Sequence, residues 1–343
     1  ETDIEIEEGL NLNVCMDARY VIPKKVKEFL PDIVISFGGN IFAGIKEQFR
    51  KFAGEFEHWL VQEDGRVVDL YKSITTIFEC KPEYFFKYCV NVADENQTND
   101  CEYYQGLKKY VDSVIYPDFP YSHVYAIKEV VEKIPADSVL HLSINDSIRI
   151  TNFFKLNPRI KTYANIGTHG IDGCLSSFLG QAAAGNKQSY LVIGDLAFFY
   201  DMNAMRLRHI KNNVHILLIN NEGGSEFYFN HMWKDEASDL HTTARHHTKA
   251  EGWVKSNNFI YLSAHDKESM QEALKEFMRS DLEKPVFLEV FTEMKTDSDV
   301  IYDFFDLSRP KDVQSETIRK SKEFIKATIG QEKAQKIAGL FKK

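Results

Sequence analysis

The fold of this chain is decided by two apolar runs, Ser189-Tyr-Leu-Val-Ile-Gly-Asp195 and Val214-His-Ile-Leu-Leu-Ile-Asn-Asn-Glu-Gly-Gly224. Each run is short and continuous, as in strands that are buried on both faces of a parallel sheet. The segment between them, residues 202–211, has a helical composition, so we expect a strand–helix–strand unit. Because parallel strands end at the same edge of a sheet, Asp195 and Asn221 should lie close together there.

The residues that end these strands suit a divalent cation bound to phosphate. Asp195 brings a carboxylate, Asn221 an amide carbonyl and Gly223 a backbone carbonyl, which are the hard oxygen ligands that Mg²⁺ prefers. The glycines at this edge would let backbone N–H groups approach a diphosphate closely. Ordinary turn chemistry at a strand end is the alternative interpretation of the same residues.

The spacing of these residues resembles the signature of thiamine-diphosphate enzymes, a Gly-Asp pair followed by two Asn residues. Three motifs then resemble one branch, the 2-succinyl-5-enolpyruvyl-6-hydroxy-3-cyclohexene-1-carboxylate (SEPHCHC) synthases: Asn165-Ile-Gly-Thr-His-Gly-Ile-Asp-Gly173, Gly194-Asp-Leu-Ala-Phe-Phe-Tyr-Asp-Met-Asn203 and Asn220-Asn-Glu-Gly-Gly224. Upstream, residues 31–39 and 57–65 resemble the central domain of these enzymes. The resemblance covers about residues 15–300 and implies an α/β fold of two doubly wound parallel-sheet domains, the second binding thiamine diphosphate.

The resemblance also implies the cofactors, thiamine diphosphate and Mg²⁺, and a set of site residues. Asp195, Asn221 and Gly223 would hold the metal. The cofactor would contact Ile171, Gly194, Leu196, Ala197, Gly224, Glu226 and Phe227, with Ile171 propping it into its V shape. The substrate would meet Asn145, Arg149 and Ile166. No catalytic residue is assigned, because the family's activating Glu lies on a pyrimidine-binding domain that these residues do not include.

Three positions depart from the family pattern and predict a changed substrate. Ile166 stands where the family has an Arg that faces an anionic substrate. Gly44-Ile45 replaces a basic pair, with Lys46 one step further along a helix and pointing elsewhere. Glu226 replaces an aliphatic residue near the reacting carbon of the cofactor. A substrate with several carboxylates needs several cations, so we expect the cofactor chemistry to be kept and the substrate choice to differ.

The pattern of strands and helices predicts four regions. They are a partial central domain at 1–100, a linker with helices at 101–130, the diphosphate-binding domain at 131–308 and a helical tail at 309–343. Strands are expected at 32–37, 57–61, 138–143, 160–164, 189–193, 214–219 and 286–291, and helices at 24–30, 41–52, 83–90, 102–114, 121–134 and 173–184. The start at Glu1, inside a domain, favours a truncated protein over a natural split one.

Composition disfavours several other classes of protein. A net charge of −9 does not suit a polyanion-binding surface, so no nucleic acid is expected. Five cysteines without a Cys-x-x-Cys pair are compatible with a reducing cytoplasm, and no apolar run has the length of a membrane span. His231, His241, His246 and His247 with Asp235, Glu236 and Asp239 do not have the spacing of a zinc site. The sequence has no Gly-x-Ser-x-Gly motif, so a serine hydrolase is not expected.

Three functional hypotheses follow. The first is part of a homo-oligomeric enzyme that decarboxylates a 2-oxoacid and adds the resulting acyl anion to an acceptor, in which the protein supplies positioning and electrostatics. This chain alone would then be inactive. The second is a non-catalytic half that binds a separate pyrimidine-binding chain. The third is a nucleotide-binding α/β protein that shares only this edge of the sheet.

Overall fold

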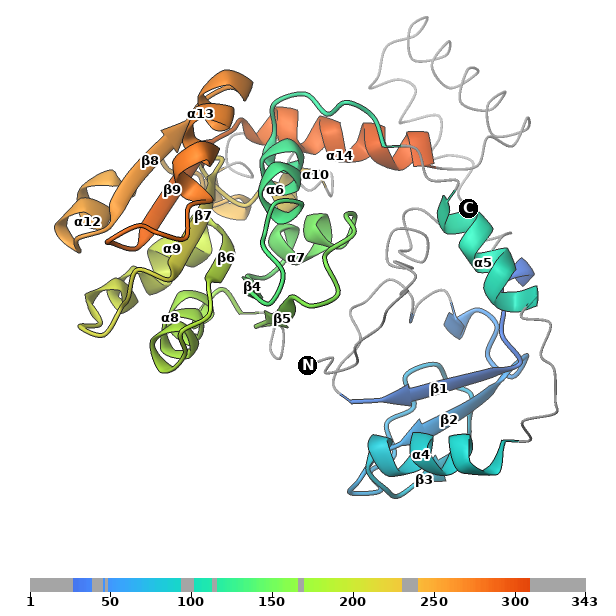
Figure 1. Ribbon diagram of the computed structural model, residues 1–343. Coiled ribbons are helices and arrows are strands. Elements are labelled where there is room, and N and C mark those ends of the chain that lie inside the picture. Colours follow the sequence, from blue (N-terminus) through green and yellow to red (C-terminus); the bar gives the residue numbers. More distant parts are fainter. Residues whose placement is uncertain are drawn as a thin grey trace, which may run out of the picture.

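The structure is a computed structural model that describes residues 27–38, 46, 49–93, 102–112, 116–165, 170–229 and 240–308. Its strands form two sheets, one of three strands and one of six, and every pairing in both is parallel (Figure 1). Helices alternate with the strands along the chain. The predicted class, α/β with two parallel-sheet units, is therefore confirmed.

The smaller sheet has the order β1-β2-β3. Its strands are β1 (Ile33–Phe37), β2 (Glu57–Val61) and β3 (Ile74–Phe78), followed by α4 (Pro82–Val92) and α5 (Glu102–Asp112). All but β3 agree with the prediction from sequence. β3 went unpredicted because two threonines interrupt its apolar residues. Of the helices predicted at 24–30 and 41–52, residues 27–30, 46 and 49–52 are described, and residues 27, 28, 46, 49 and 50 are helical.

A buried polar group ties this sheet together. Ser36 Oγ lies 2.6 Å from His58 Nε2, and Asp69 Oδ1 lies 3.6 Å from His58 Nδ1. The three residue types are those of a serine-hydrolase triad, but Ser36 is only 5% exposed, in a strand, so a substrate cannot reach it. Burial lowers the pKa of His58 despite the nearby carboxylate. The group is thus a structural link between β1, β2 and the segment that leads to β3.

The larger sheet has the order β5-β4-β6-β7-β9-β8. Its strands are β4 (Val139–Leu142), β5 (Lys161–Ala164), β6 (Ser189–Gly194), β7 (Val214–Asn220), β8 (Ile260–Ala264) and β9 (Val286–Phe291). After β4 the chain adds β5 on one side, and it then returns to add β6 on the other. This reversal opens a crevice beyond the carboxyl ends of β4 and β6, the place where doubly wound sheets bind ligands.

Helices cover both faces of the larger sheet (Figure 1). They are α6 (His123–Val131), α7 (Asp146–Thr151), α8 (Cys174–Ala184), α9 (Asp195–Asp201), the 3₁₀ helix η1 (Met202–Arg206), α10 (Ser225–Phe229), α12 (Glu251–Ser256), α13 (Lys267–Phe277) and α14 (Met294–Ser308). One core cluster joins α6, α7, α13 and α14, and a second joins α8, α9 and α12. In β6, Tyr190 and Val192 belong to the first cluster and Leu191 and Ile193 to the second. Burial on both faces explains why residues 190–193 of this strand are all hydrophobic.

The elements of the larger sheet differ from the prediction in several places, and the helices α7, α10, α12, α13 and α14 were not predicted. The helix predicted at 202–211 is wrong, because α9 begins at Asp195, directly after β6, and only a 3₁₀ turn continues to Arg206. The apolar side chains of Ala197 and Phe198 pull this earlier segment into the core. β8 was not predicted. The domain limits stay predictions, and α6, predicted to be linker, packs in the core of the larger sheet.

None of the helices in the described ranges is long and apolar enough to cross a membrane. Within the same ranges, Cys80, Cys89 and Cys174 are free thiols.

A buried histidine in β4 should make the stability of the larger sheet sensitive to acid. His141 packs between Tyr163 and Phe178, with ring centroids 5.2 and 5.4 Å away, and burial lowers its pKa to about 4. The unfolded chain binds this proton near pH 6.5, so the contribution to stability is complete above that pH and is lost as pH falls toward 4. Between pH 7.5 and 5 the loss should be about 2 kcal/mol.

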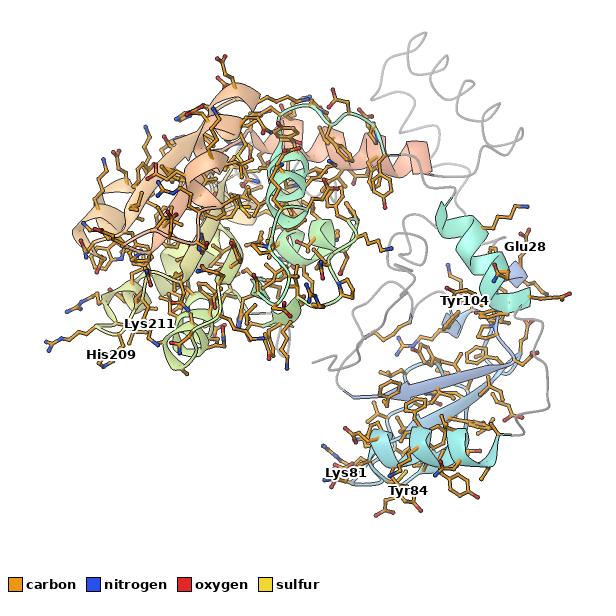
Figure 2. All side chains as sticks on the ribbon, viewed as in Figure 1. Glu28, Lys81, Tyr84, Tyr104, His209 and Lys211 are labelled. Carbon is orange, nitrogen blue, oxygen red and sulfur yellow. The ribbon has the colours of Figure 1, made fainter. Side chains whose placement is uncertain are left out.

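We expect His141→Phe to remove this loss. Urea unfolding at the two pH values should give a drop in the free energy of unfolding that is smaller than in the wild type by about 2 kcal/mol. His209→Phe is the control substitution, since His209 lies at the surface (Figure 2). Equal pH dependence in His141→Phe and the wild type would contradict the prediction.

Candidate functional site

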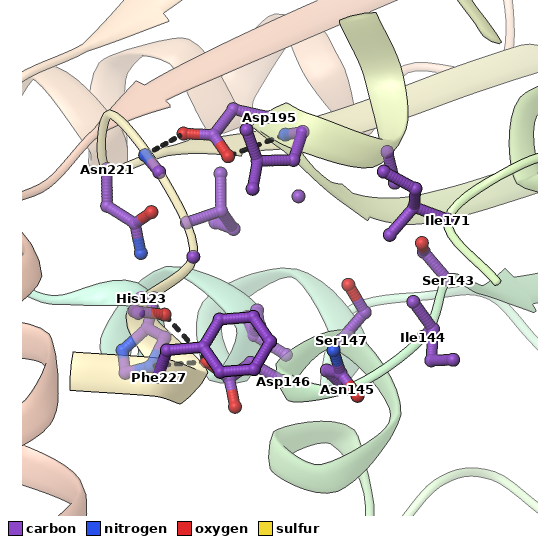
Figure 3. Close-up of a pocket in the computed structure, with 18 residues that line it drawn as sticks. His123, Ser143, Ile144, Asn145, Asp146, Ser147, Ile171, Asp195, Asn221 and Phe227 are labelled. Atoms are coloured by element: carbon purple, nitrogen blue, oxygen red, sulfur yellow. Dashed lines mark hydrogen bonds and ion pairs between the residues drawn. The ribbon is translucent and has the colours of Figure 1, made fainter. Parts of the chain in front are cut away.

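A cavity of about 110 Å³ lies at the carboxyl edge of the larger sheet (Figure 3). Three chain segments line it: residues 143–147 after β4, residues 194–197 at the end of β6, and the residues that follow β7 up to Ser225. Ile219 at the end of β7 and the side chains of His123, Ile127, Ile171 and Phe227 complete the lining. The cavity therefore occupies the crevice that the reversal of strand order creates.

Most residues predicted for the site come together in this cavity. Those that line it are Asn145, Ile171, Gly194, Asp195, Leu196, Ala197, Asn221, Gly223, Gly224 and Phe227. Arg149 does not line it: the side chain is buried, and its Nη1 donates to Asp146 Oδ1 at 3.0 Å. Ile166 and the side chain of Glu226 lie outside the described residues, as do Gly44 and Ile45.

Asp195 is the buried carboxylate at the centre of the site. Its Oδ1 accepts from the N–H of Leu196 at 2.6 Å, and its Oδ2 accepts from the N–H of Gly223 at 3.0 Å. His246 Nε2 lies 3.3 Å from the same Oδ2, and the hydrogen bond to Asp195 raises the pKa of His246. Asp195 therefore joins the end of β6 to the loop after β7 and places a carboxylate in the lining of the cavity.

The loop after β7 needs glycine at position 223. Gly223 has φ +152°, and a Cβ there would lie 2.7 Å from the carbonyl oxygen of Thr243 and 2.9 Å from Met294 Cε. Glycine alone therefore fits between the loop and its neighbours. A Cβ on Gly194, in contrast, would meet no atom within 4 Å, because this glycine faces the open cavity. The space beside Gly194 is a place where a ligand can approach the backbone.

The two successive asparagines are each held by a buried carboxylate. Asn220 Nδ2 donates to Glu289 Oε1 at 2.7 Å, and Asn221 Nδ2 donates to Asp297 Oδ2 at 3.0 Å. Asn220 Oδ1 also accepts a hydrogen bond from the N–H of Glu222 at 3.3 Å, and this contact bends the chain out of β7. Asn220 thus shapes the loop, while Asn221 lines the cavity.

A buried ionic network that the sequence did not reveal lies under the cavity. His123 Nδ1 is 3.2 Å from Asp297 Oδ1, and His123 Nε2 is 3.8 Å from Asp146 Oδ2. Burial alone would lower the pKa of His123, but the charge and hydrogen bond of Asp297 raise it. Burial would likewise raise the pKa of Asp297, but His123, Thr292 and Asn221 lower it. Each shift favours the charged form of its group.

Two further polar atoms point to an anionic ligand. The Nε2 of His123 and the Oγ of Ser143 are buried in the lining of the cavity, and neither has a hydrogen-bond partner among the residues that the structure describes. Buried donors without a partner are costly, so such groups commonly serve a ligand or water. Ser143 is the last residue of the strand predicted at 138–143, and this position at the carboxyl edge is a signal that could have identified it. For His123 and Asp297 no signal of this kind existed.

Asn145 has an unusual backbone conformation, with φ 59° and ψ −117°, between β4 and α7. Non-glycine residues rarely adopt it, and such strain is concentrated at functional sites. In the histidine-rich segment, His231, Asp235, Glu236 and Asp239 lie outside the described residues, whereas His247 pairs with Glu222 at 3.1 Å. No group of three metal-binding side chains was found in the parts of the chain that the structure covers.

Comparison with known proteins gives one consistent result. The chain is 33% identical over 288 residues to a SEPHCHC synthase of Phocaeicola vulgatus, which covers 82% of this chain and 51% of that protein. It is 35% identical over 286 residues to the synthase of Bacteroides fragilis, with 82% and 51% covered. It is 32% identical over 282 residues to the synthase of Flavobacterium psychrophilum, with 81% of this chain and 50% of that protein covered. No family profile matches the chain.

The resemblance to SEPHCHC synthases that the motifs predicted is therefore confirmed. The chain spans about half the length of the curated relatives that it matches.

Proposed function

We propose that this chain, as a relative of SEPHCHC synthases over four-fifths of its length, forms the diphosphate- and Mg²⁺-binding part of a thiamine-diphosphate enzyme. The observation that carries the proposal is the meeting of Asp195, Asn221 and Gly223 in one cavity at the switch point of a doubly wound sheet. Oxygen ligands from the ends of two neighbouring strands suit Mg²⁺ that also binds phosphate.

The residues present fit this cofactor. Asp195 and Asn221 bring oxygen ligands, and the space beside Gly194 lets a diphosphate reach the backbone of Leu196 and Ala197. His123 Nε2 and Ser143 Oγ have no hydrogen-bond partner within the described chain and could donate to phosphate oxygens. Ile171 also lines the cavity and would support the rings of the cofactor. When bound, thiamine diphosphate supplies the carbanion chemistry, while these residues bind and orient it.

The substrate class proposed is a 2-oxoacid, with an acceptor that differs from that of the relatives. Ile166, in place of an Arg, and Glu226, in place of an aliphatic residue, would both disfavour a multiply charged acceptor. Arg149 is held by Asp146 in the free chain, so a substrate carboxylate would have to compete with that pair. Selection among acids would therefore depend on how strongly each draws Arg149 away from Asp146.

The chain spans about half the length of its relatives. The whole reaction is therefore proposed for these residues together with the half of the relatives that the match does not cover. That half would supply the activating Glu, either within a longer polypeptide or as a separate chain, and copies of the protein would assemble. On this proposal, the residues present here bind the cofactor but do not turn over a 2-oxoacid.

Isothermal titration calorimetry with thiamine diphosphate tests the proposal, with and without Mg²⁺. We expect binding that depends on Mg²⁺; affinity that is absent, or equal without the metal, would contradict it. Gly194→Val should weaken this binding by about 1–3 kcal/mol, roughly 5- to 150-fold, because its methyl groups fill the space needed by the ligand. Gly194→Ala, with one added carbon, is the graded control and should have a smaller effect. Binding by Gly194→Val that equals the wild type would place the cofactor elsewhere.

A further inference from the structure

The side-chain amide of Asn221 is held in one orientation by its neighbour. Asn221 is 6% exposed, and its Nδ2 donates to Asp297 Oδ2 at 3.0 Å. An ionised carboxylate only accepts hydrogen bonds, so the amide cannot turn over without placing its own oxygen against another acceptor. In Figure 3 the amide nitrogen of Asn221 points to the side of His123, and the oxygen lies on the side of Asp195. The orientation thus presents the oxygen where a metal ligand is needed.

Asp297 is itself fixed from three directions. Its Oδ1 accepts from the backbone N–H of His123 at 2.8 Å, and its Oδ2 accepts from Thr292 Oγ1 at 2.7 Å as well as from Asn221. The side chain is 0% exposed, and the His123 imidazole is the counter-charge that makes burial of this carboxylate tolerable. Residues of α6 and of the segment after β9 therefore meet at Asp297 in α14, and Asp297 in turn holds Asn221.

We propose that Asp297 is a positioning residue for the metal site, acting through the amide of Asn221. The inference rests on the proposed function, because it takes Asn221 as a metal ligand. Partners behind a metal ligand typically contribute 10- to 100-fold in metal affinity by fixing the orientation of that ligand. Asp297→Asn removes the fixed orientation, since an amide at position 297 can meet Asn221 with either its oxygen or its nitrogen.

Calorimetric titration of Mg²⁺ into the protein with thiamine diphosphate present measures the effect. We expect Asp297→Asn to weaken Mg²⁺ binding about 10- to 100-fold. Asp299→Asn is the matched control, on the same helix but with an exposed side chain that pairs with Lys295, and should change the affinity less than twofold. Thermal unfolding confirms that each variant is folded. Should Asp297→Asn fail to fold, Thr292→Val, which removes one donor to the same oxygen, should give a smaller loss of Mg²⁺ affinity.

A double-mutant cycle with Asn221→Ala separates positioning from a general effect of charge or stability. If Asp297 acts through Asn221, Asp297→Asn should cost no further Mg²⁺ affinity once the amide of Asn221 is gone. An equal loss in both backgrounds would overturn the proposal. The cofactor-free protein gives a second test by NMR. The Asn221 side-chain NH₂ should exchange slowly with water in the wild type and quickly in Asp297→Asn.

The two proposals fail in different ways. If the wild type binds thiamine diphosphate with Mg²⁺ and Asp297→Asn binds Mg²⁺ equally well, positioning by Asp297 is wrong while the cofactor site stands. If the wild type does not bind, the proposed function is wrong and Asn221 loses its role as a ligand. In that case the NMR result would still report whether Asp297 orients the amide as a purely structural contact.

Discussion

Asp195→Ala should weaken Mg²⁺-dependent binding of thiamine diphosphate by more than 100-fold, because it removes the carboxylate that lines the cavity with Asn221 and Gly223. Among the described residues, the other carboxylate in the lining is Asp146, which is paired with Arg149. A direct ligand should cost more than the roughly 10- to 100-fold expected for the partner of a ligand. Calorimetry on the folded variant measures the change. Affinity equal to that of the wild type would remove Asp195 from the metal site.

The same substitution should also cost some stability, and a control is needed for that. The N–H groups of Leu196 and Gly223 lose their acceptor, which corresponds to about 1–3 kcal/mol. Asp201→Ala is matched to it: Asp201, the last residue of α9, accepts from the N–H and the hydroxyl of Ser176 at 2.7 and 2.8 Å. This variant should lose comparable stability and keep its affinity for the cofactor. Equal losses of affinity in the two variants would indicate destabilisation in place of a lost ligand.

Gly223→Ala should destabilise the larger sheet by roughly 2–5 kcal/mol, the sum of a strained backbone conformation and an overpacked contact. The added carbon would lie 2.7 Å from the Thr243 oxygen, and the positive φ disfavours any side chain. Movement of the loop away from Thr243 would also separate Asn221 from Asp195, so cofactor binding should fall. Urea unfolding and calorimetry measure the two effects.

Gly180→Ala is the control for this substitution. Gly180 lies within α8, and a Cβ there would meet nothing within 4 Å, so alanine should stabilise the helix by up to about 1 kcal/mol. Opposite signs in the two glycine variants are thus expected from the same chemical change. A Gly223→Ala protein as stable as the wild type would mean that the loop after β7 can relax without cost.

Much of the fold could be predicted because its signals are local. β6 and β7 are mostly apolar and buried at almost every position, a pattern typical of strands covered on both faces of a parallel sheet. Their polar ends then had to meet at one edge of the sheet. β8 was missed because its residues are only partly buried at the edge of the sheet, which weakens the apolar signal. The start of α9 was missed because Asp195, expected to end a strand, also begins the helix.

The candidate site divides in the same way. The sequence by itself pointed to Asp195, Asn221 and Gly223 as the proposed metal ligands, since each follows an apolar strand and offers an oxygen that Mg²⁺ can bind. Only the tertiary structure decided that Asp297, 76 positions from Asn221, orients its amide, and that His123 balances the charge of Asp297. No periodicity or motif joins these residues, because they come from separate elements that meet only when the helices pack on the sheet. The residue types that could bind a metal can be identified from the local sequence, whereas the orientation of their side chains depends on contacts between distant segments.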